Sequence, residues 1–448
     1  MFNYSKQISR LLERKSILFV FWCFIASFGA YFTMYAFRKP FNAAEYSGFS
    51  AFGMSLKTVL ILSQVSGYML SKFLGVKVIS ELKANKRVIL IIGLIVFAQL
   101  ALIGFSIVPV PLKFVCLILN GLPLGMVWGI IFSFLEGRKL TELIATGLSV
   151  SAIVSSGSLK SLGRMLIENY GVSDFWMPAL IGFFFLPLFL LFVWMLSVIP
   201  APNEKDVARK SKRLPMTKEG RRKVFLAYGI AVFTLVLTYT MLCIYRDFRD
   251  NFAVEIWHEL DSKGDTSVFT ATEIPIALAV ILITSTLAFF KSNFKGLFFT
   301  FTLIFIGLLL IGFSNFLFTM HMLSPIVWMT LNGLGLYMAY VPFQIVVYER
   351  FVALFKINGN AGYFMYLSDS VGYLGSILVL VYKEFFVSKT NWLAFFQSLS
   401  YSIMIAGFIL LLAASLWIAR RYLTQRKSEY GEEEGSKIAF AADLDSQA

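Results

Sequence analysis

The stretch Tyr31–Gly48, YFTMYAFRKPFNAAEYSG, ends the first long apolar run of the chain and places Arg38 and Lys39 side by side. If that run crosses a bilayer, a charged side chain near its centre costs about 2.5–3.5 kcal/mol on insertion scales. The pair is therefore either an interfacial anchor, whose long side chains reach the headgroups, or a binding site for an anion. Tyr35 lies one helical turn before the pair and belongs to the same candidate site.

The composition of the chain is that of an integral membrane protein. Of the 448 residues, 58% are hydrophobic and 15% are charged, and the mean hydropathy is +0.74. Average soluble chains are about 25% charged. The formal net charge of +14 does not indicate nucleic-acid binding, because most cations lie between apolar runs, where they set the topology. We therefore expect a lipid bilayer around the chain and no nucleic acid as a partner.

The cysteines and histidines give no sign of a metal or cofactor. Cys23, Cys116 and Cys243 fall in apolar runs, where a cysteine behaves as a small hydrophobic residue. They show neither the spacing of a zinc site nor a disulfide framework. His258 and His321 are far apart in the sequence and have no nearby cluster of ligands. We expect no cofactor and no metal.

Twelve apolar runs are long enough to cross a bilayer, for which about 20 residues are needed. We predict an all-α membrane protein of two pseudo-symmetric six-helix bundles, residues 1–200 and 224–420, joined by a basic cytoplasmic linker, residues 201–223. A polar cytoplasmic tail, residues 421–448, is expected to be disordered. The expected spans are Ser16–Phe37, Leu56–Ser80, Arg87–Val108, Lys113–Leu135, Glu142–Ile167, Phe175–Ile199, Val224–Tyr245, Phe269–Phe290, Lys295–Phe318, Ser324–Tyr348, Gly359–Val381 and Trp392–Ile418.

The two halves of the chain also repeat in sequence. Asn120–Arg138, NGLPLGMVWGIIFSFLEGR, and Asn332–Arg350, NGLGLYMAYVPFQIVVYER, both begin with Asn-Gly-Leu and are the fourth spans of their halves. Two such halves indicate parallel repeats that bind substrate near the midplane between them. Lysine and arginine fall in alternate loops, which predicts a plasma-membrane protein with cytoplasmic termini, and we expect it in the bacterial inner membrane.

Two motifs connect the chain with a known superfamily. YAFRKPF, residues 35–41, is similar to a Tyr-x-x-Arg-Lys-x-Phe motif, and GYMLSKFLG, residues 67–75, is similar to a second-helix motif followed by a basic loop. The chain resembles the major facilitator superfamily over nearly its whole length. Over about residues 30–90 it resembles the organophosphate:inorganic phosphate antiporters, the family of the glycerol-3-phosphate and hexose-phosphate transporters.

The resemblance implies a twelve-helix antiporter, monomeric, with Arg38 and Lys72 contacting a small anionic solute and with protons or phosphate as the coupling ion. The chain departs from the narrower family at one important position, since Thr238 stands where the family has a second arginine. The stretch TMLCIYRDFRDNFAVEIW, residues 240–257, instead looks like an uncharacterised membrane family within or beside the superfamily.

Lys72 and Asp369 are ionisable residues inside predicted spans and need an explanation. Lys72 in the second span would line a substrate cavity, pair with an acid, or snorkel to the surface. Asp369 in the eleventh span would couple transport to protons, pair with a cationic side chain of the cavity, or make a hydrogen bond between helices.

Lys160 and Arg164 are four residues apart and share one face of the fifth span. They would line a path for anions, or they would be outer-end anchors that pair with Glu168 or Asp174.

The segment RDFRD, residues 246–250, closes the seventh span with charges of both signs. Arg246 and Asp250 are one turn apart and are expected to pair, either as a structural cluster or as an outer gate that attracts substrate. Charged pairs at the cytoplasmic ends of the repeated stretches are expected to act as gates: Glu136 with Arg138, and Glu349 with Arg350.

These residues leave three functions to consider. The first is a secondary active transporter of a small organic anion, with organophosphates among the candidates, that works by rocker-switch alternating access. Its anion would be held by Arg38, Lys72, Tyr35 and Lys39, with Lys160 and Arg246 as further candidates. The second is a transport-fold sensor that binds an anion without flux. The third is a membrane enzyme that acts on lipid intermediates. An enzyme is not expected, because the sequence has no nucleophile–histidine–acid grouping, HExxH, GxSxG or P-loop.

Overall fold

The computed structural model describes residues 2–80, 82, 84–135, 141–200, 218–260, 265–357, 361–387 and 391–445. Each of the twelve predicted spans overlaps one of the long helices, so the all-α membrane fold is confirmed. Two predicted spans, Leu56–Ser80 and Lys113–Leu135, coincide with helices residue for residue. The spanning helices are α2 (Ser16–Tyr35), α3 (Leu56–Ser80), α4 (Arg87–Ile107), α5 (Lys113–Leu135), α6 (Thr141–Glu168), α7 (Met177–Ser197), α9 (Lys218–Asn251), α11 (Val268–Ser285), α12 (Asn293–Thr319), α13 (Pro325–Pro342), α15 (Ala361–Phe386) and α16 (Trp392–Asp445).

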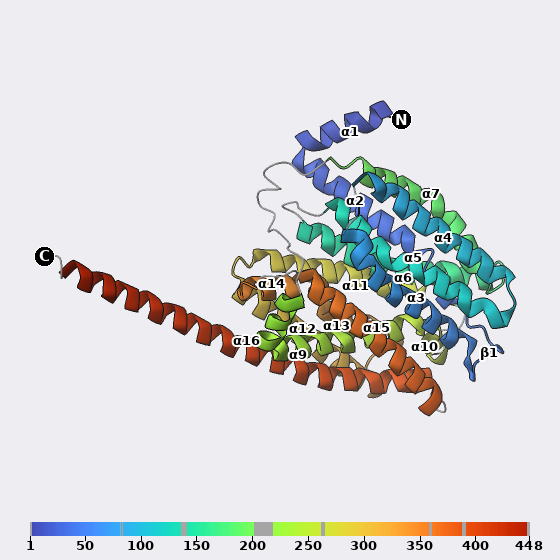
Figure 1. Cartoon of the computed structure of the whole chain (residues 1–448). Coiled ribbons are helices and arrows are strands. Elements are labelled where there is room, and N and C mark those ends of the chain that lie inside the picture. The colour runs from blue at the N-terminus through green and yellow to red at the C-terminus, as the bar shows by residue number, and fades with distance from the viewer. Residues whose placement is uncertain are drawn as a thin grey trace.

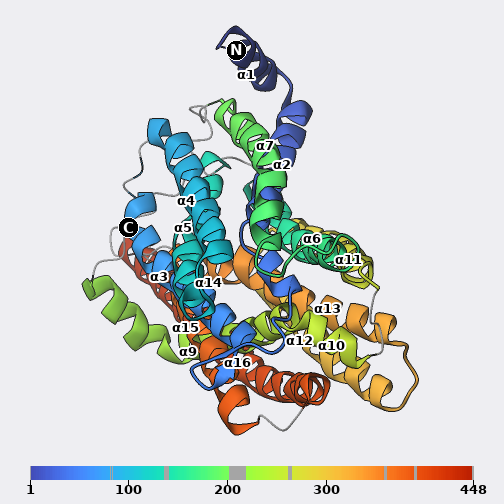
Figure 2. The same cartoon turned by 90° about the vertical axis from the view of Figure 1, so that its right-hand side faces the viewer.

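Shorter elements connect these helices or precede them. A helix of 13 residues at the N-terminus lies off the end of α2, away from the bundle (Figure 2). The short elements are α1 (Phe2–Arg14), η1 (Pro40–Ala43), β1 (Ser50–Ala51), β2 (Met54–Ser55), η2 (Ala84–Lys86), η3 (Val110–Leu112), α10 (Ala253–Glu259), η4 (Thr286–Phe289), the π-helical η5 (Phe343–Val347) and α14 (Tyr348–Leu354).

Nine helices in the described part of the chain are long and apolar enough to cross a membrane by length and composition alone. The helices α3, α6 and α13 fall outside that set. Each carries polar side chains buried inside the protein, such as Lys72 on α3, Lys160 on α6 and Asn332 on α13. Their lower hydropathy therefore reflects the polar centre of the molecule.

The two halves pack by the same scheme. In the first half α2 contacts α6 and α7, α5 contacts α3 and α4, and α4 contacts α7. In the second half α9 contacts α15 and α16, α13 contacts α11 and α12, and α12 contacts α16. These are the same pairs of helix positions in each half, which is the pseudo-symmetry predicted from the repeated sequence. Figure 1 shows the blue to green helices of the first half lying above the yellow to red helices of the second.

Two helix pairs carry the main contact between the halves. The first is α3 against α15, and the second is α6 against α11. Since α3 and α11 are the second helices of their halves, and α6 and α15 the fifth, the two contacts are related by the same pseudo-symmetry. The pairs lie side by side in both views (Figures 1 and 2).

The closest helix approach within the first half depends on two glycines. A Cβ at Gly67 of α3 would lie 2.2 Å from the carbonyl oxygen of Ile118, and a Cβ at Gly121 of α5 would lie 2.2 Å from that of Gln64. Only glycine allows backbones to approach this closely, and small residues serve this purpose in membrane helices. The Asn-Gly-Leu motif therefore places its glycine at a tight contact with α3.

Two sequence predictions about helix ends are corrected by the structure. The tenth span was expected as one helix, but α13 ends at Pro342 and a π-helical turn, η5, follows before α14. Proline removes a backbone donor, and a local π turn is one way to satisfy the freed backbone groups in a membrane helix. The tail was expected to be disordered, but α16 continues as a helix of 54 residues to Asp445 and projects from the bundle (Figure 1).

Candidate functional site

Arg38 is placed by the end of α2. The chain leaves α2 at Tyr35, and Pro40 starts the buried turn η1, because proline cannot extend the preceding ladder of hydrogen bonds. Residues 36–43 therefore fold back into the protein. The side chain of Arg38 is 7% exposed, which does not fit an interfacial anchor. Its guanidinium carbon lies 3.9 Å from the ring centroid of Tyr68 on α3 and 5.6 Å from that of Tyr35.

In the described part of the chain, no acidic side chain pairs with the guanidinium of Arg38. Its Nε is buried without a hydrogen-bond partner, and no ion pair joins Arg38 to a carboxylate among the described residues. Two aromatic faces attract the cation, but cation–π contacts are worth only about 0.5–2 kcal/mol. A buried charge is costly unless it is paired and hydrogen-bonded. Among the described residues, Arg38 is thus a buried cation without a carboxylate partner.

Lys72 and Asp369 join the two halves at the contact of α3 with α15. The Nζ of Lys72 lies 3.3 Å from the Oδ2 of Asp369, and both side chains are buried. Tyr239 of α9 donates a hydrogen bond of 2.5 Å to the Oδ1 of the same carboxylate. Of the alternatives left open by the sequence, the structure shows pairing for both residues and an interhelical hydrogen bond for Asp369. Lys72 does not snorkel.

Arg246 on α9 pairs with its neighbour in the sequence. Its Nε and Nη2 lie 2.9 Å and 2.7 Å from the Oδ1 of Asp247. Its Nη1 donates to the hydroxyl of Tyr340, and its guanidinium carbon lies 5.6 Å from the ring centroid of Tyr373. The predicted pair between Arg246 and Asp250 is wrong. The two side chains are one turn apart, but Asp250 faces the first half and Arg246 faces α13 and α15.

These contacts form a closed ring of side chains from four helices, α3, α9, α13 and α15, and from the turn that follows α2. Arg38 and Lys72 lie over the same tyrosine of α3, and that tyrosine packs edge-on against a tyrosine of α15 at 5.3 Å between centroids. On the far side, the hydroxyls of a tyrosine on α9 and one on α13 are 2.9 Å apart. We call this set the central ring, and its members are Arg38, Tyr68, Lys72, Asp369, Tyr239, Tyr340, Arg246 and Tyr373.

A second group of charges joins the halves where α2 and α9 end, which the sequence predicts to be outside. Asp250 pairs with Lys39 and with Lys160, and it accepts a hydrogen bond from Ser156. Lys39 also donates to the side chain of Asn251 at 3.2 Å. We call this group the outer network. It also includes Lys57, Glu255, Glu45, His258, Arg164 and Glu168. Lys39 is as buried as Arg38, so the anchor interpretation fails for both.

The outer network continues along α10. Lys57 of α3 lies 2.5 Å from Glu255, and Glu45 lies 2.9 Å from His258. Both pairs tie α10 of the second half to the first half. Arg164 pairs with Glu168, as one of the sequence alternatives predicted, and also with Glu45.

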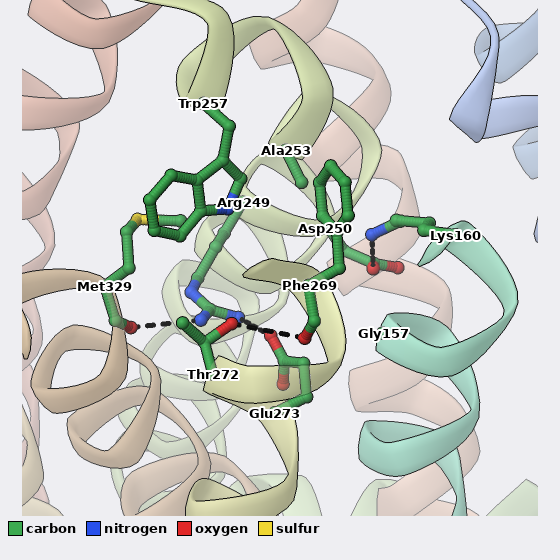
Figure 3. A pocket seen from close by; sticks show the side chains of 10 residues that line it. All are labelled: Gly157, Lys160, Arg249, Asp250, Ala253, Trp257, Phe269, Thr272, Glu273 and Met329. Carbon is green, nitrogen blue, oxygen red and sulfur yellow. Dashed lines mark hydrogen bonds and ion pairs between the residues drawn. The ribbon is translucent and has the colours of Figure 1, made fainter. Parts of the chain in front are cut away.

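A small cavity lies beside Asp250 at the contact of α6 with α11. Lys160 points to Asp250 from one side, while on the other Arg249 lies 2.5 Å from Glu273 (Figure 3). The accessible volume of about 10 Å³ is close to that of one water molecule. The cavity is thus too small for an organic substrate and belongs to the outer closure. Its lining is completed by Gly157, Ala253, Trp257, Phe269, Thr272 and Met329.

Of the two predicted cytoplasmic gate pairs, the structure describes one. Glu136 and Arg138 lie outside the described residues. Arg350 donates hydrogen bonds to the carbonyl oxygens of Phe290 at 3.0 Å, Ser292 at 3.3 Å and Leu287 at 3.0 Å. Arg350 therefore holds α14 against the end of η4 and the start of α12.

The role of the tyrosines was not predicted from the sequence. Tyr68 stood in a quoted motif without a function, and Tyr239, Tyr340 and Tyr373 were not singled out. A signal was available, since each is a tyrosine inside a predicted apolar span and away from the membrane interface, where tyrosine is usually enriched. Thr238 is fully buried and donates to a backbone carbonyl, so in the second half the cation of the ring comes from Arg246.

Comparisons with known proteins support the fold. The model of a family described as a family of unknown function (DUF5690) matches residues 40–421. No curated protein matches the sequence. The nucleoside transporter NupG is similar in structure, with a TM-score of 0.59, 12% identity, and coverage of 88% of this chain and 98% of that one. The MFS (major facilitator superfamily) proton:xylose symporter XylE, bound to 6-bromo-6-deoxy-D-glucose, gives a TM-score of 0.57, 14% identity, and coverage of 91% and 96%. At such low identities the similarity shows the fold, which is that of the major facilitator superfamily.

Proposed function

The chain belongs to DUF5690, a family of unknown function, and we propose that it is a secondary active transporter of a small organic anion. The observation that carries the proposal is the guanidinium of Arg38, which is buried, lies between aromatic faces and has no carboxylate partner among the described residues. An anionic substrate would supply that partner. Arginine offers a planar set of donors that suits carboxylate and phosphate groups.

The position of Arg38 supports transport by alternating access. It lies in the central ring, where helices of both halves meet, and this is where parallel-repeat transporters bind substrate. The outer network closes one side of that ring with ion pairs between the halves. Opening would require those pairs to separate. A substrate could therefore reach the central ring from the outer side only when the outer network is broken. NupG and XylE are named as transporters of small solutes, which agrees with this mode of action.

Coupling would fall to the pair of Lys72 and Asp369. This pair bridges the halves, and a proton on Asp369 would remove the attraction between the two side chains. The likeness of residues 30–90 to organophosphate antiporters supports an anion as substrate, with phosphate exchange as the alternative form of coupling. We place the protein in the bacterial inner membrane as a monomer with cytoplasmic termini.

The first test is thermal unfolding of the purified protein with a panel of anions: inorganic phosphate, glycerol 3-phosphate, sugar phosphates and carboxylates. A ligand at 100 times its dissociation constant should stabilise the protein by about 2.7 kcal/mol. Arg38→Gln should abolish that stabilisation. Arg221→Gln is the matched control, because Arg221 also lies over a tyrosine ring but is exposed at the start of α9. Stabilisation that persists in Arg38→Gln would refute the site.

Flux must then be measured in liposomes with the anion that the unfolding assay identifies. Uptake by the wild type that is lost in Arg38→Gln supports the transporter. Binding that depends on Arg38 without any flux would favour the sensor instead.

A further inference from the structure

Resting on the proposed function, we infer that the substrate is a hydroxylated monocarboxylate of the sugar-acid class, which carries one negative charge where an organophosphate carries two. The inference follows from the charge balance of the central ring and from the tyrosines around Arg38.

The ring holds three cations, and two of them are already matched by carboxylates. Lys72 lies 3.3 Å from Asp369, and Arg246 makes two contacts of 2.9 Å and 2.7 Å with Asp247. Only Arg38 is left without an acid among the described residues. A buried site favours a ligand that cancels its charge, because any excess stays uncompensated where water is scarce. One unmatched cation therefore selects a monoanion.

Lys39 does not add a second cation to this site. It is the neighbour of Arg38 in the sequence, but it pairs with Asp250 and donates to Asn251, both in the outer network. A phosphate monoester carries a charge of about −1.5 to −2 at neutral pH. In the ring it would keep a negative charge that no cation matches.

Tyrosine hydroxyls around Arg38 indicate the rest of the substrate. Four tyrosine rings lie at or near Arg38: Tyr35 and Tyr68 contact its guanidinium, Tyr31 packs against Tyr35, and Tyr373 packs against Tyr68. Their hydroxyls have no hydrogen-bond partner among the described residues. None of these hydroxyl oxygens is among the fully buried polar atoms that lack a partner, so they face space that a ligand can enter. Substrate hydroxyl groups would supply these partners, and the aromatic faces suit the apolar faces of a sugar ring.

The experiment compares three ligands that share one sugar ring: D-glucuronate with one negative charge, D-glucose 6-phosphate with about two, and neutral D-glucose. Dissociation constants are measured by calorimetry on the purified full-length protein. For the wild type we expect D-glucuronate to bind at least tenfold more tightly than either of the other ligands. Glucose 6-phosphate that binds as tightly as glucuronate, or more tightly, would overturn the inference while leaving an Arg38-dependent anion site intact. If no ligand of the three, and no anion of the earlier panel, binds in a way that depends on Arg38, the proposed function fails as well.

Charge-release variants test the same balance from the other direction. Asp247→Asn frees Arg246 from its acid, so the ring gains a second unmatched cation, and the preference should shift at least tenfold toward glucose 6-phosphate. Asp369→Asn frees Lys72 and should shift the ligand preference in the same direction. With two variants, the test still decides if one of them does not fold. Glu219→Gln is the matched control, because it makes the same chemical change in an exposed pair with Lys223 and should leave the preference unchanged. An unchanged preference in both folded aspartate variants would contradict the charge argument.

Discussion

Asp250→Asn should bias the protein toward opening at the predicted outer side. In the closed structure the Asp250 carboxylate pairs with Lys39 and Lys160 and accepts from Ser156, and its side chain is 12% exposed. The two lysines are buried, at 6% and 3% exposure. Replacing the carboxylate by an amide leaves both cations without an acid in the closed state. In the open state water reaches them, so the same substitution has little effect there.

The size of the shift follows from that difference. Removing one partner of a buried ion pair costs about 3–5 kcal/mol, because the remaining charge is buried and uncompensated. Each 1.4 kcal/mol changes an equilibrium constant tenfold. The ratio of open to closed protein should therefore rise by roughly 10²- to 4 × 10³-fold.

Cys243 is the natural reporter of this opening. It is fully buried on α9, next to the ring residue Arg246, whose Nη2 lies 3.2 Å from its sulfur. With Cys23 and Cys116 replaced by alanine, a membrane-impermeant maleimide added from the predicted outer side would label only this thiol. We expect Asp250→Asn to be labelled at least 100-fold faster than the parent.

The control for this measurement is Glu219→Gln, since its pair with Lys223 is more than 75% exposed and such pairs contribute at most about 1 kcal/mol. Labelling in that variant should match the parent. Equal labelling rates for Asp250→Asn and its parent, with both proteins folded, would refute the argument that Asp250 holds the outer side closed.

Three further outcomes are expected. Gly121→Ala should destabilise the protein by about 1–3 kcal/mol in thermal unfolding, because its Cβ would lie 2.2 Å from a carbonyl oxygen of α3. Gly93→Ala is the control and should be neutral or stabilising, because a Cβ at Gly93 would have no atom within 4 Å. Asp369→Asn should destabilise more than the double variant with Lys72→Met, because the single change leaves a buried ammonium unpaired; additive effects would show that the two residues are uncoupled. Tyr245→Phe should cost about 1 kcal/mol, since its hydroxyl contacts two buried side chains at 2.8 Å and 2.6 Å, and an unchanged melting temperature would count against this role.

The helices were predictable because the signal for them is local. A membrane span is an apolar run of fixed length, and its ends are marked by charges or prolines within a few residues. That is why α3 and α5 begin and end at the predicted residues. The break between α13 and η5 was also marked, by Pro342, but a proline in a membrane helix gives a bend, a break or neither, depending on what packs beside it.

The pairings of the site were not predictable in the same way. Asp250 had a cation one turn away on its own helix, which made Arg246 the obvious partner. Its actual partners, Lys39 and Lys160, are about 200 and 90 positions away in the sequence. Spacing along a helix identifies which side chains share a face, but it does not say which helix of the other half meets that face.

Arg38 and Lys39 show how much depends on the turn after α2. The sequence presented them as one doublet with one role, anchor or anion site. In the structure they are consecutive residues of a buried turn, and their side chains enter different groups: Arg38 lies over Tyr68 in the central ring, and Lys39 pairs with Asp250 in the outer network. One peptide unit thus links the unmatched cation to the contact that closes the predicted outer side. In the proposed site, the residue that would bind the anion and a residue that closes the outer side are thus adjacent in one short segment of the chain.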